Sequence, residues 1–179
     1  MPNTNRIISP YIPNGDPDTM NETSLYAPGD LGAAFDCNDR AYQVVQLDSG
    51  ATASTAVGVV AANQVAFWKD QDKYLVTNNN LQAIGLAAGA PNFVAGIFRC
   101  AATAGNYICI LQRGDNIPVA DDGGDNVVGD TAVADATVST SRMTHVNVGT
   151  ASTFKKIGIV RGVTAAAVTR VDVDIPNIP

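Results

Sequence analysis

The sequence has few of the residues that usually cover exposed helices. Leu and Lys are sparse, and the only Glu is Glu22, whereas solvent-facing helix positions are commonly filled by Leu, Lys and Glu. Ala, Val, Thr and Gly dominate instead. Val and Thr are branched at Cβ, which makes them stiff and suits them to the pleated surface of a sheet. The composition therefore predicts an all-β fold.

Long apolar runs are also absent. No stretch approaches the roughly 18 consecutive apolar residues that a membrane helix requires. The first residues, MPNTNRIISPYIPNGD, lack the apolar core segment of a secretory signal and are interrupted by proline. We therefore expect no membrane partner, and we expect synthesis in the cytoplasm.

Concentrated positive charge is a third absence. The formal net charge is −6, and Lys155–Lys156 is the only adjacent pair of basic residues. Binding to a phosphate backbone requires clustered Lys and Arg side chains. We therefore expect no direct contact with nucleic acid. The negative charge rests almost wholly on Asp, a residue that favours turns.

Cys37, Cys100 and Cys109 form an odd set of cysteines without the spacing of a metal site. A two-residue hairpin turn at Gly105–Asn106 would place Cys109 opposite Ala102, with Cys100 only a diagonal neighbour. The Cα atoms of a disulfide lie within about 7 Å of each other, so a bridge would need a different register. We predict free thiols.

Residues 1–40 differ from the rest of the chain. A long helix or a central strand is excluded there by Pro2, Pro10, Pro13, Pro17, Pro28, Gly15, Gly29 and Gly32. The segment is nevertheless more apolar than a typical disordered tail. An extended arm lying on a surface would reconcile these facts, and so would a loop-rich lead-in packed on its own domain. We divide the chain into an extended N-terminal arm, residues 1–40, and a β-rich globular domain, residues 41–179.

From residue 41 onward, short β-rich runs alternate with turn residues. One hairpin is expected over residues 64–77, around a polar turn at 70–72. A second hairpin is expected to join residues 93–99 to residues 107–113. Single strands are expected at residues 42–48, 144–148, 154–162 and 169–176.

The last of these strands has the clearest pattern. Val171, Val173 and Ile175 alternate with Asp172 and Asp174. Alternation at a period of two residues predicts a strand with one buried and one exposed face.

The sequence offers little for catalysis. His145 is the only histidine, and a nucleophilic triad would need it to meet an acid and a Ser or Cys, without any nucleophile-elbow pattern in support. A lone histidine on a strand is far more often hydrogen-bonded or solvent-facing than catalytic. No Gly-rich segment matches a phosphate loop or a dinucleotide fingerprint. We predict no catalytic residue and no cofactor.

Acidic residues gather in DDGGDNVVGD, residues 121–130. Their oxygens are of the kind that binds calcium, but the segment lacks the ligand order and the closing Glu of an EF-hand. We interpret it as an acidic turn and predict no metal site. Exposed turn positions are the general prediction for the paired acids Asp70 and Asp72, Asp121 and Asp122, and Asp172 and Asp174.

Three stretches together resemble a known family. They are VAGIFRCAATAGNYICILQRGD (94–115), FWKDQDKYLVTN (67–78), and STFKKIGIVRG with VDVDIPNIP near the end. The matching motif residues are Ala95, Gly96, Ile97, Ala104, Gly105, Tyr107, Gln112, Arg113 and Gly114. With these residues the chain, over about residues 40 to 179, resembles the head decoration proteins of tailed bacteriophages, which are cement proteins bound to the outside of an assembled capsid.

The resemblance implies a β-barrel or β-tulip-like domain without catalysis. It implies a homo-oligomer, with a trimer favoured, at or near the threefold axes of the major capsid protein lattice. The location implied is the exterior of the virion. On this reading, the apolar faces of the hairpin 93–113 serve either the core of the domain or a trimer axis. The residues we select as contacts with the capsid or a neighbouring subunit are Arg6, Ile7, Ile8, Tyr11, Ile12 and Trp68.

Two other functions stay open at this point. A carbohydrate-binding or adhesin-like module of a phage fibre or cell surface would use Trp68 for stacking and residues 121–130 as a ligand or calcium site. A hydrolase with an unrecognised site would need His145.

Overall fold

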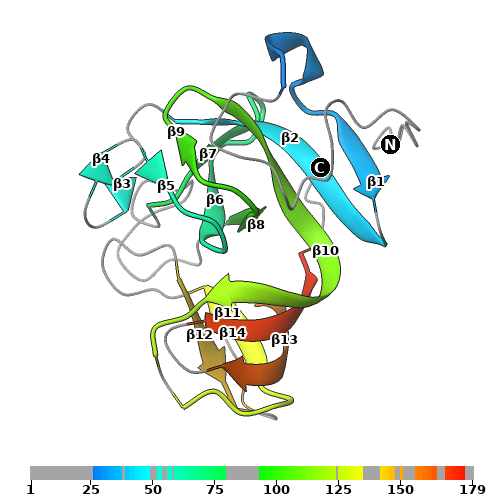
Figure 1. Cartoon of the computed structure of the whole chain (residues 1–179), viewed down its shortest axis with the longest axis vertical. Coiled ribbons are helices and arrows are strands. Elements are labelled where there is room, and N and C mark those ends of the chain that lie inside the picture. Colours follow the sequence, from blue (N-terminus) through cyan, green and yellow to red (C-terminus); the bar gives the residue numbers. More distant parts are fainter. Residues whose placement is uncertain are drawn as a thin grey trace.

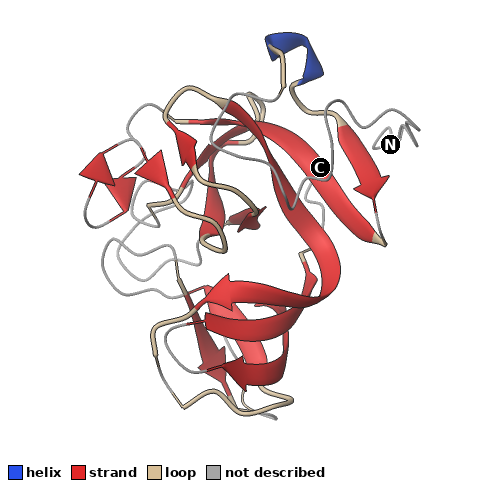
Figure 2. Cartoon of the chain, in the orientation of Figure 1, coloured by secondary structure: helices blue, strands red, loops and turns tan. Residues whose placement is uncertain are grey.

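In the computed structural model, the described part of the chain consists mainly of strands (Figures 1 and 2). The structure describes residues 26–37, 39–48, 52–53, 56–57, 59–79, 93–123, 125–134, 142–147, 150, 156–164 and 168–175. The only helical element among these residues is one turn of 3-10 helix, η1 (Pro28–Asp30). The predicted all-β fold is confirmed.

Five strands close a small barrel in the upper half of Figure 1. They are β2 (Arg40–Leu47), β6 (Val65–Asp70), β7 (Leu75–Thr77), β8 (Val94–Phe98) and β10 (Tyr107–Ala120). The order around the barrel is β2-β7-β6-β8-β10, and β10 pairs again with β2. The β2–β7 pair is parallel, and the other pairs are antiparallel. The predicted small barrel is therefore confirmed.

Outer strands surround this barrel. The strand β1 (Ala34–Cys37) pairs antiparallel with β2. Two short ribbons lie beside the barrel: β3 (Thr52–Ala53) pairs with β4 (Ala56–Val57), and β5 (Val59–Val60) pairs with β9 (Ala102–Thr103).

The strand β10 continues into a second ring of strands in the lower half of Figure 1. The ring consists of the end of β10 with β14 (Val168–Asp174), β13 (Lys156–Thr164), β11 (Thr131–Ala134) and β12 (Met143–Val146), paired in that order. A single bridge between Asp121 and Met143 brings β12 back to the end of β10. The pairings of β10 shift register at 111–113 and 114–117, and such bulges let one strand bend through both rings.

The buried side chains fall into two clusters. On β10, Ile108 and Ile110 belong to one cluster, whereas Cys109 and Leu111 belong to the other. Both faces of β10 are therefore covered within a single chain in this region. The strand β8 is buried along its whole length. The described apolar side chains on both faces of the predicted hairpin thus belong to the chain's own core.

The predicted strands and hairpins are present, but one register differs from the sequence expectation. The strands β6 and β7 form the first predicted hairpin, and β8 pairs with β10 as the second. Phe98 lies opposite Ile110, and Ala102 pairs with Val60 of β5 instead of facing Cys109. The tight turn lies one residue earlier than expected: Asn106 N–H donates to the Thr103 carbonyl at 3.2 Å, and Gly105 N–H donates to the carbonyl of Leu47 at 2.8 Å.

The described end of the predicted arm lies against the domain. Tyr26 is 5% exposed and belongs to a core cluster. Phe35 of β1 stacks on Tyr42, with ring centroids 5.5 Å apart. Residues 1–25 are outside the described residues. No helix in the described part of the chain is long and apolar enough to cross a membrane.

Candidate interaction surface and its polar supports

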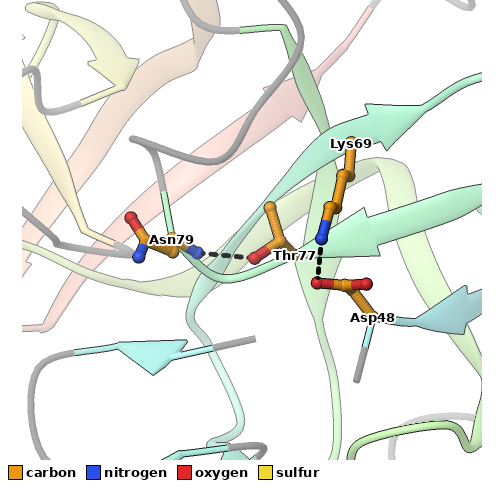
Figure 3. A network of polar contacts seen from close by, with 4 residues as sticks. All are labelled: Asp48, Lys69, Thr77 and Asn79. Carbon is orange, nitrogen blue, oxygen red and sulfur yellow. Dashed lines mark hydrogen bonds and ion pairs between the residues drawn. The ribbon is translucent and has the colours of Figure 1, made fainter. Parts of the chain in front are cut away.

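A cluster of buried and partly buried polar side chains lies where β2 and β7 end beside β6. Figure 3 shows Asp48 and Lys69 pointing toward each other, with Thr77 and Asn79 next to them. Lys69 Nζ lies 2.5 Å from Asp48 Oδ2, and Asn79 N–H donates to Thr77 Oγ1 at 3.1 Å. Because β7 lies between β2 and β6 in the sheet, the ion pair reaches across β7. The ion pair joins the end of β2 to β6, and the Asn79 hydrogen bond closes the chain locally at the end of β7.

A second cluster of polar side chains fixes the conformation of the segment between β10 and β11. Asp121 is 2% exposed; its Oδ1 accepts from Gly123 N–H at 2.7 Å and its Oδ2 accepts from the Thr169 hydroxyl. Asn126 Nδ2 donates to Thr169 Oγ1 at 3.3 Å. Asp130 Oδ2 accepts from Val127 N–H at 3.0 Å. Both carboxylate oxygens of Asp121 and Oδ2 of Asp130 therefore accept hydrogen bonds from the chain's own donors.

The prediction of an exposed turn position is wrong for Asp121. The strand β10 runs on to residue 120, and the Asp121 bridge to Met143 draws this residue into the second ring. Asp72 and Asp122 are exposed as predicted. The predicted turn position is wrong for Asp70, which ends β6, and for Asp172 and Asp174, which lie on β14; of these three, only Asp174 is exposed. Within the described residues, no three potential metal-ligating side chains lie close enough together to hold an ion.

His145 lies on β12 opposite Ala132 of β11. Its Nδ1 atom is buried and has no hydrogen-bond partner among the described residues. A catalytic base is normally oriented through a hydrogen bond to its second ring nitrogen. The described surroundings of His145 provide no such orienting contact to Nδ1.

The cysteines whose side chains are described are free, as predicted. Cys100 and Cys109 are both buried. Burial raises the pKa of the Cys109 thiol to about 12, and burial, together with the neighbouring Cys109 thiol, raises the pKa of the Tyr26 hydroxyl well above its ordinary value. Neutral, buried thiols are poor nucleophiles. The side chain of Cys37 is outside the described residues.

The selected contact residues separate into two groups. Arg6, Ile7, Ile8, Tyr11 and Ile12 all lie outside the described residues. Trp68 is 4% exposed and belongs to a core cluster. Its ring meets that of Tyr74 edge-on, with centroids 6.4 Å apart.

The described surface does expose one apolar pair. Val127 is 60% exposed and Val128 is 59% exposed, and no other large hydrophobic side chain in the described part of the chain is exposed. We call Val127 and Val128 the valine pair. Sequence reasoning missed it because the neighbouring aspartates dominated the interpretation of residues 121–130. The sequence feature that points to this exposed pair is two consecutive Val residues inside an otherwise polar turn segment.

Comparisons of the chain with protein-family models, with curated proteins and with solved structures find no match.

Proposed function

We propose that this chain is a virion structural protein that binds the outer surface of an assembled phage capsid and stabilises it without catalysis. The observation that carries the proposal is that the segment 121–130 buries some of its polar side chains and exposes its apolar ones. Its buried polar side chains bind the chain's own backbone and Thr169, while its valine pair faces solvent. The segment therefore offers apolar surface to a partner, beside the exposed carboxylates of Asp122 and Asp125.

The fold suits this role. A closed barrel has no open sheet edges of its own, and the second ring continues the same long strand β10. Strand pairing therefore connects both rings into one framework. A protein that stabilises a capsid lattice needs such a framework to keep its shape when it binds. The family resemblance adds the partner, which is the major capsid protein, and the site, which is the exterior of the head.

We propose that the chain acts as a homo-oligomer, with a trimer favoured. A protein that binds the assembled lattice and not its free subunits stabilises the shell by mass action. A trimer engages several lattice sites at once, so weak individual contacts add up to tight binding. Neither a nucleic acid nor a membrane takes part in this proposal.

The carbohydrate-binding alternative receives no support from the geometry. It relied on an accessible Trp68, whose side chain is almost fully buried. It also relied on the acids of 121–130, of which Asp121 and Asp130 are occupied by internal hydrogen bonds.

A head-stability assay tests the proposal. Heads of the encoding phage that lack this protein are heated with and without the purified chain, and release of packaged DNA is recorded. Added protein is expected to raise the release temperature in a concentration-dependent way that saturates. An unchanged release temperature at saturating protein would contradict the proposal.

A further inference from the structure

The segment 26–37, which we call the strap, lies outside the closed barrel (Figure 1). Its strand β1 is the outermost strand at one end of the ten-stranded sheet and pairs with β2. The barrel closes through β2, β7, β6, β8 and β10 without any pairing to β1. The barrel can therefore keep all of its own strand pairs when the strap is detached.

Aromatic packing and the pairing of β1 with β2 attach the strap. Within the strap, the rings of Tyr26 and Phe35 lie 6.3 Å apart, and Phe35 stacks on Tyr42 of β2. The ion pair between the strap and β10 is long and exposed, because Arg113 Nη2 lies 4.0 Å from Asp36 Oδ1. Exposed ion pairs contribute little to stability. The strap is therefore held less firmly than the strands inside the barrel, which pair on both sides.

The ring of Tyr74 covers Gly32 of the strap. A Cβ atom at Gly32 would lie 2.6 Å from both Cε2 and Cζ of Tyr74, and Gly32 has a positive φ of 83°. Both features require glycine at this position. The same ring meets Trp68 edge-on and packs against a core cluster of the barrel. Tyr74 therefore connects the barrel core to the strap.

The backbone of Tyr74 is strained. Its φ is 51°, a left-handed conformation that is an outlier for a bulky residue. Its N–H donates to the Gln71 carbonyl at 3.1 Å, and its carbonyl accepts from Gln46 N–H at 3.0 Å. Such strain persists only where the surrounding structure holds it, and strained residues are frequent in clamps and switch regions. Because the Tyr74 ring rests on Gly32, the strap is part of the structure that holds this strain.

We propose that the strap opens from the barrel as one unit, with Tyr74 as its latch and the β1–β2 turn as its hinge. This turn joins the strap to the barrel, and Asp39 within it has a positive φ of 62°. Opening carries residues 1–25, which precede the strap, away from the barrel. It also uncovers the edge of β2 at residues 40–43, where β1 pairs in the closed state. The inference goes beyond the proposed function and does not depend on capsid binding.

Native-state hydrogen exchange of the full-length chain tests the opening. Gly32 N–H donates to the Val44 carbonyl at 2.9 Å and Val44 N–H donates to the Ala33 carbonyl at 2.8 Å, so both amides report on the strap. Trp68 N–H donates to the Phe93 carbonyl at 2.9 Å and reports on the barrel. A unit that opens locally loses protection without global unfolding. The protection of the strap amides is therefore expected to be at least about tenfold lower than that of Trp68, a difference of about 1.4 kcal/mol.

Two substitutions disturb the latch. Gly32→Ala places a methyl group where the Tyr74 ring lies, and Tyr74→Leu removes the ring. Gly29→Ala is the matched control, because Gly29 lies in the same strap and a Cβ atom there meets nothing within 4 Å. Each latch variant is expected to lower the protection of the strap amides by a further factor of about ten, with a smaller change at Trp68. The control is expected to exchange like the wild type.

Equal protection of the strap and barrel amides in the wild type would overturn the inference, because the strap would then open only together with the whole fold. Equal losses at the strap and barrel amides in both latch variants would overturn the role of Tyr74 as the latch. The wild-type comparison decides the first point even if a variant does not fold. Binding to heads is measured separately, so failure of the proposed function and failure of this inference are distinguishable.

Discussion

The Thr169 hydroxyl of β14 donates a hydrogen bond to the carboxylate of Asp121, which directly follows β10. Both side chains are buried. The contact links the end of the strand shared by the two rings to β14, and Asn126 and Gly123 bond to the same pair. The loop that carries the valine pair is therefore coupled to the framework through Asp121 and Thr169.

Replacing Asp121 by Ala should destabilise the fold. The substitution leaves the Thr169 hydroxyl and Gly123 N–H without their acceptor, and an unsatisfied buried donor costs roughly 1–3 kcal/mol. Urea denaturation measures the loss. Asp125→Ala is the control, because Asp125 is exposed in the same loop and a surface change of this kind stays within about 0.5 kcal/mol. Equal effects of the two substitutions would contradict the internal role of Asp121.

The fluorescence of Trp68 tests whether its side chain is buried. Trp68 is the only tryptophan in the chain, so emission reports on a single site. The native protein should emit at shorter wavelength than free tryptophan and resist quenching by acrylamide, and both properties should disappear on unfolding. Trp68→Ala should cost about 3–5 kcal/mol. Solvent-like emission from the native protein would place Trp68 at the surface, as a sugar-stacking function would require.

The buried thiols should react slowly in the native state. Burial raises the pKa of Cys109 to about 12, so the reactive thiolate is scarce at pH 8. In a Cys37→Ser background, which removes the thiol whose side chain is not described, labelling by a disulfide reagent should proceed only as fast as the protein unfolds. Rapid labelling of the folded protein would show that Cys100 or Cys109 is accessible.

The same raised pKa predicts lower stability in alkali. Because the folded state holds the Cys109 proton more tightly than the unfolded chain does, this contribution is complete below the unfolded pKa of about 8.5. It declines as the pH rises from there through the folded value. Denaturation midpoints of the wild type and of Cys109→Ala should therefore converge as the pH increases from 8 to 11.

Asp172 should make stability fall in acid. Partial burial acts to raise the pKa of Asp172, but the hydrogen bond from Asn116 N–H and the ion pair with Arg161 outweigh it and lower the pKa. A lowered folded pKa adds stability above the unfolded value of about 3.9, and this stability is lost as the pH falls through the folded pKa. Asp172→Asn should therefore be less stable than the wild type at pH 7, with the difference shrinking below about pH 4. Asp174→Asn, at an exposed position on the same strand, is the matched control for the change of side chain.

Local patterns in the sequence were sufficient to predict much of the strand content. The alternation from Val171 to Ile175 is reproduced in β14 and the residue that follows it: Val171, Val173 and Ile175 are buried, Asp172 is half-buried and Asp174 is exposed. The side-chain period of two residues is a local property of a strand. It can be recognised without knowing the partners of that strand.

Long-range pairing could not be predicted in the same way. The parallel contact of β2 with β7 and the second pairing of β10 with β2 close the barrel, yet each joins segments far apart in the sequence. The burial of Asp121 depends on its bridge to Met143, a residue beyond the loop. The same dependence hid the valine pair, because a turn of sequence NVVG exposes its valines only when neighbouring strands hold its polar residues inside.

The central claim is that this chain binds an assembled capsid, and cosedimentation with decoration-free heads tests it most directly. Saturable binding at a fixed number of copies per capsomer is expected. Deletion of residues 1–20, which include the selected contacts Arg6, Ile7, Ile8, Tyr11 and Ile12, is expected to weaken that binding. Absence of binding to assembled heads, or binding that never saturates, would rule out a decoration protein.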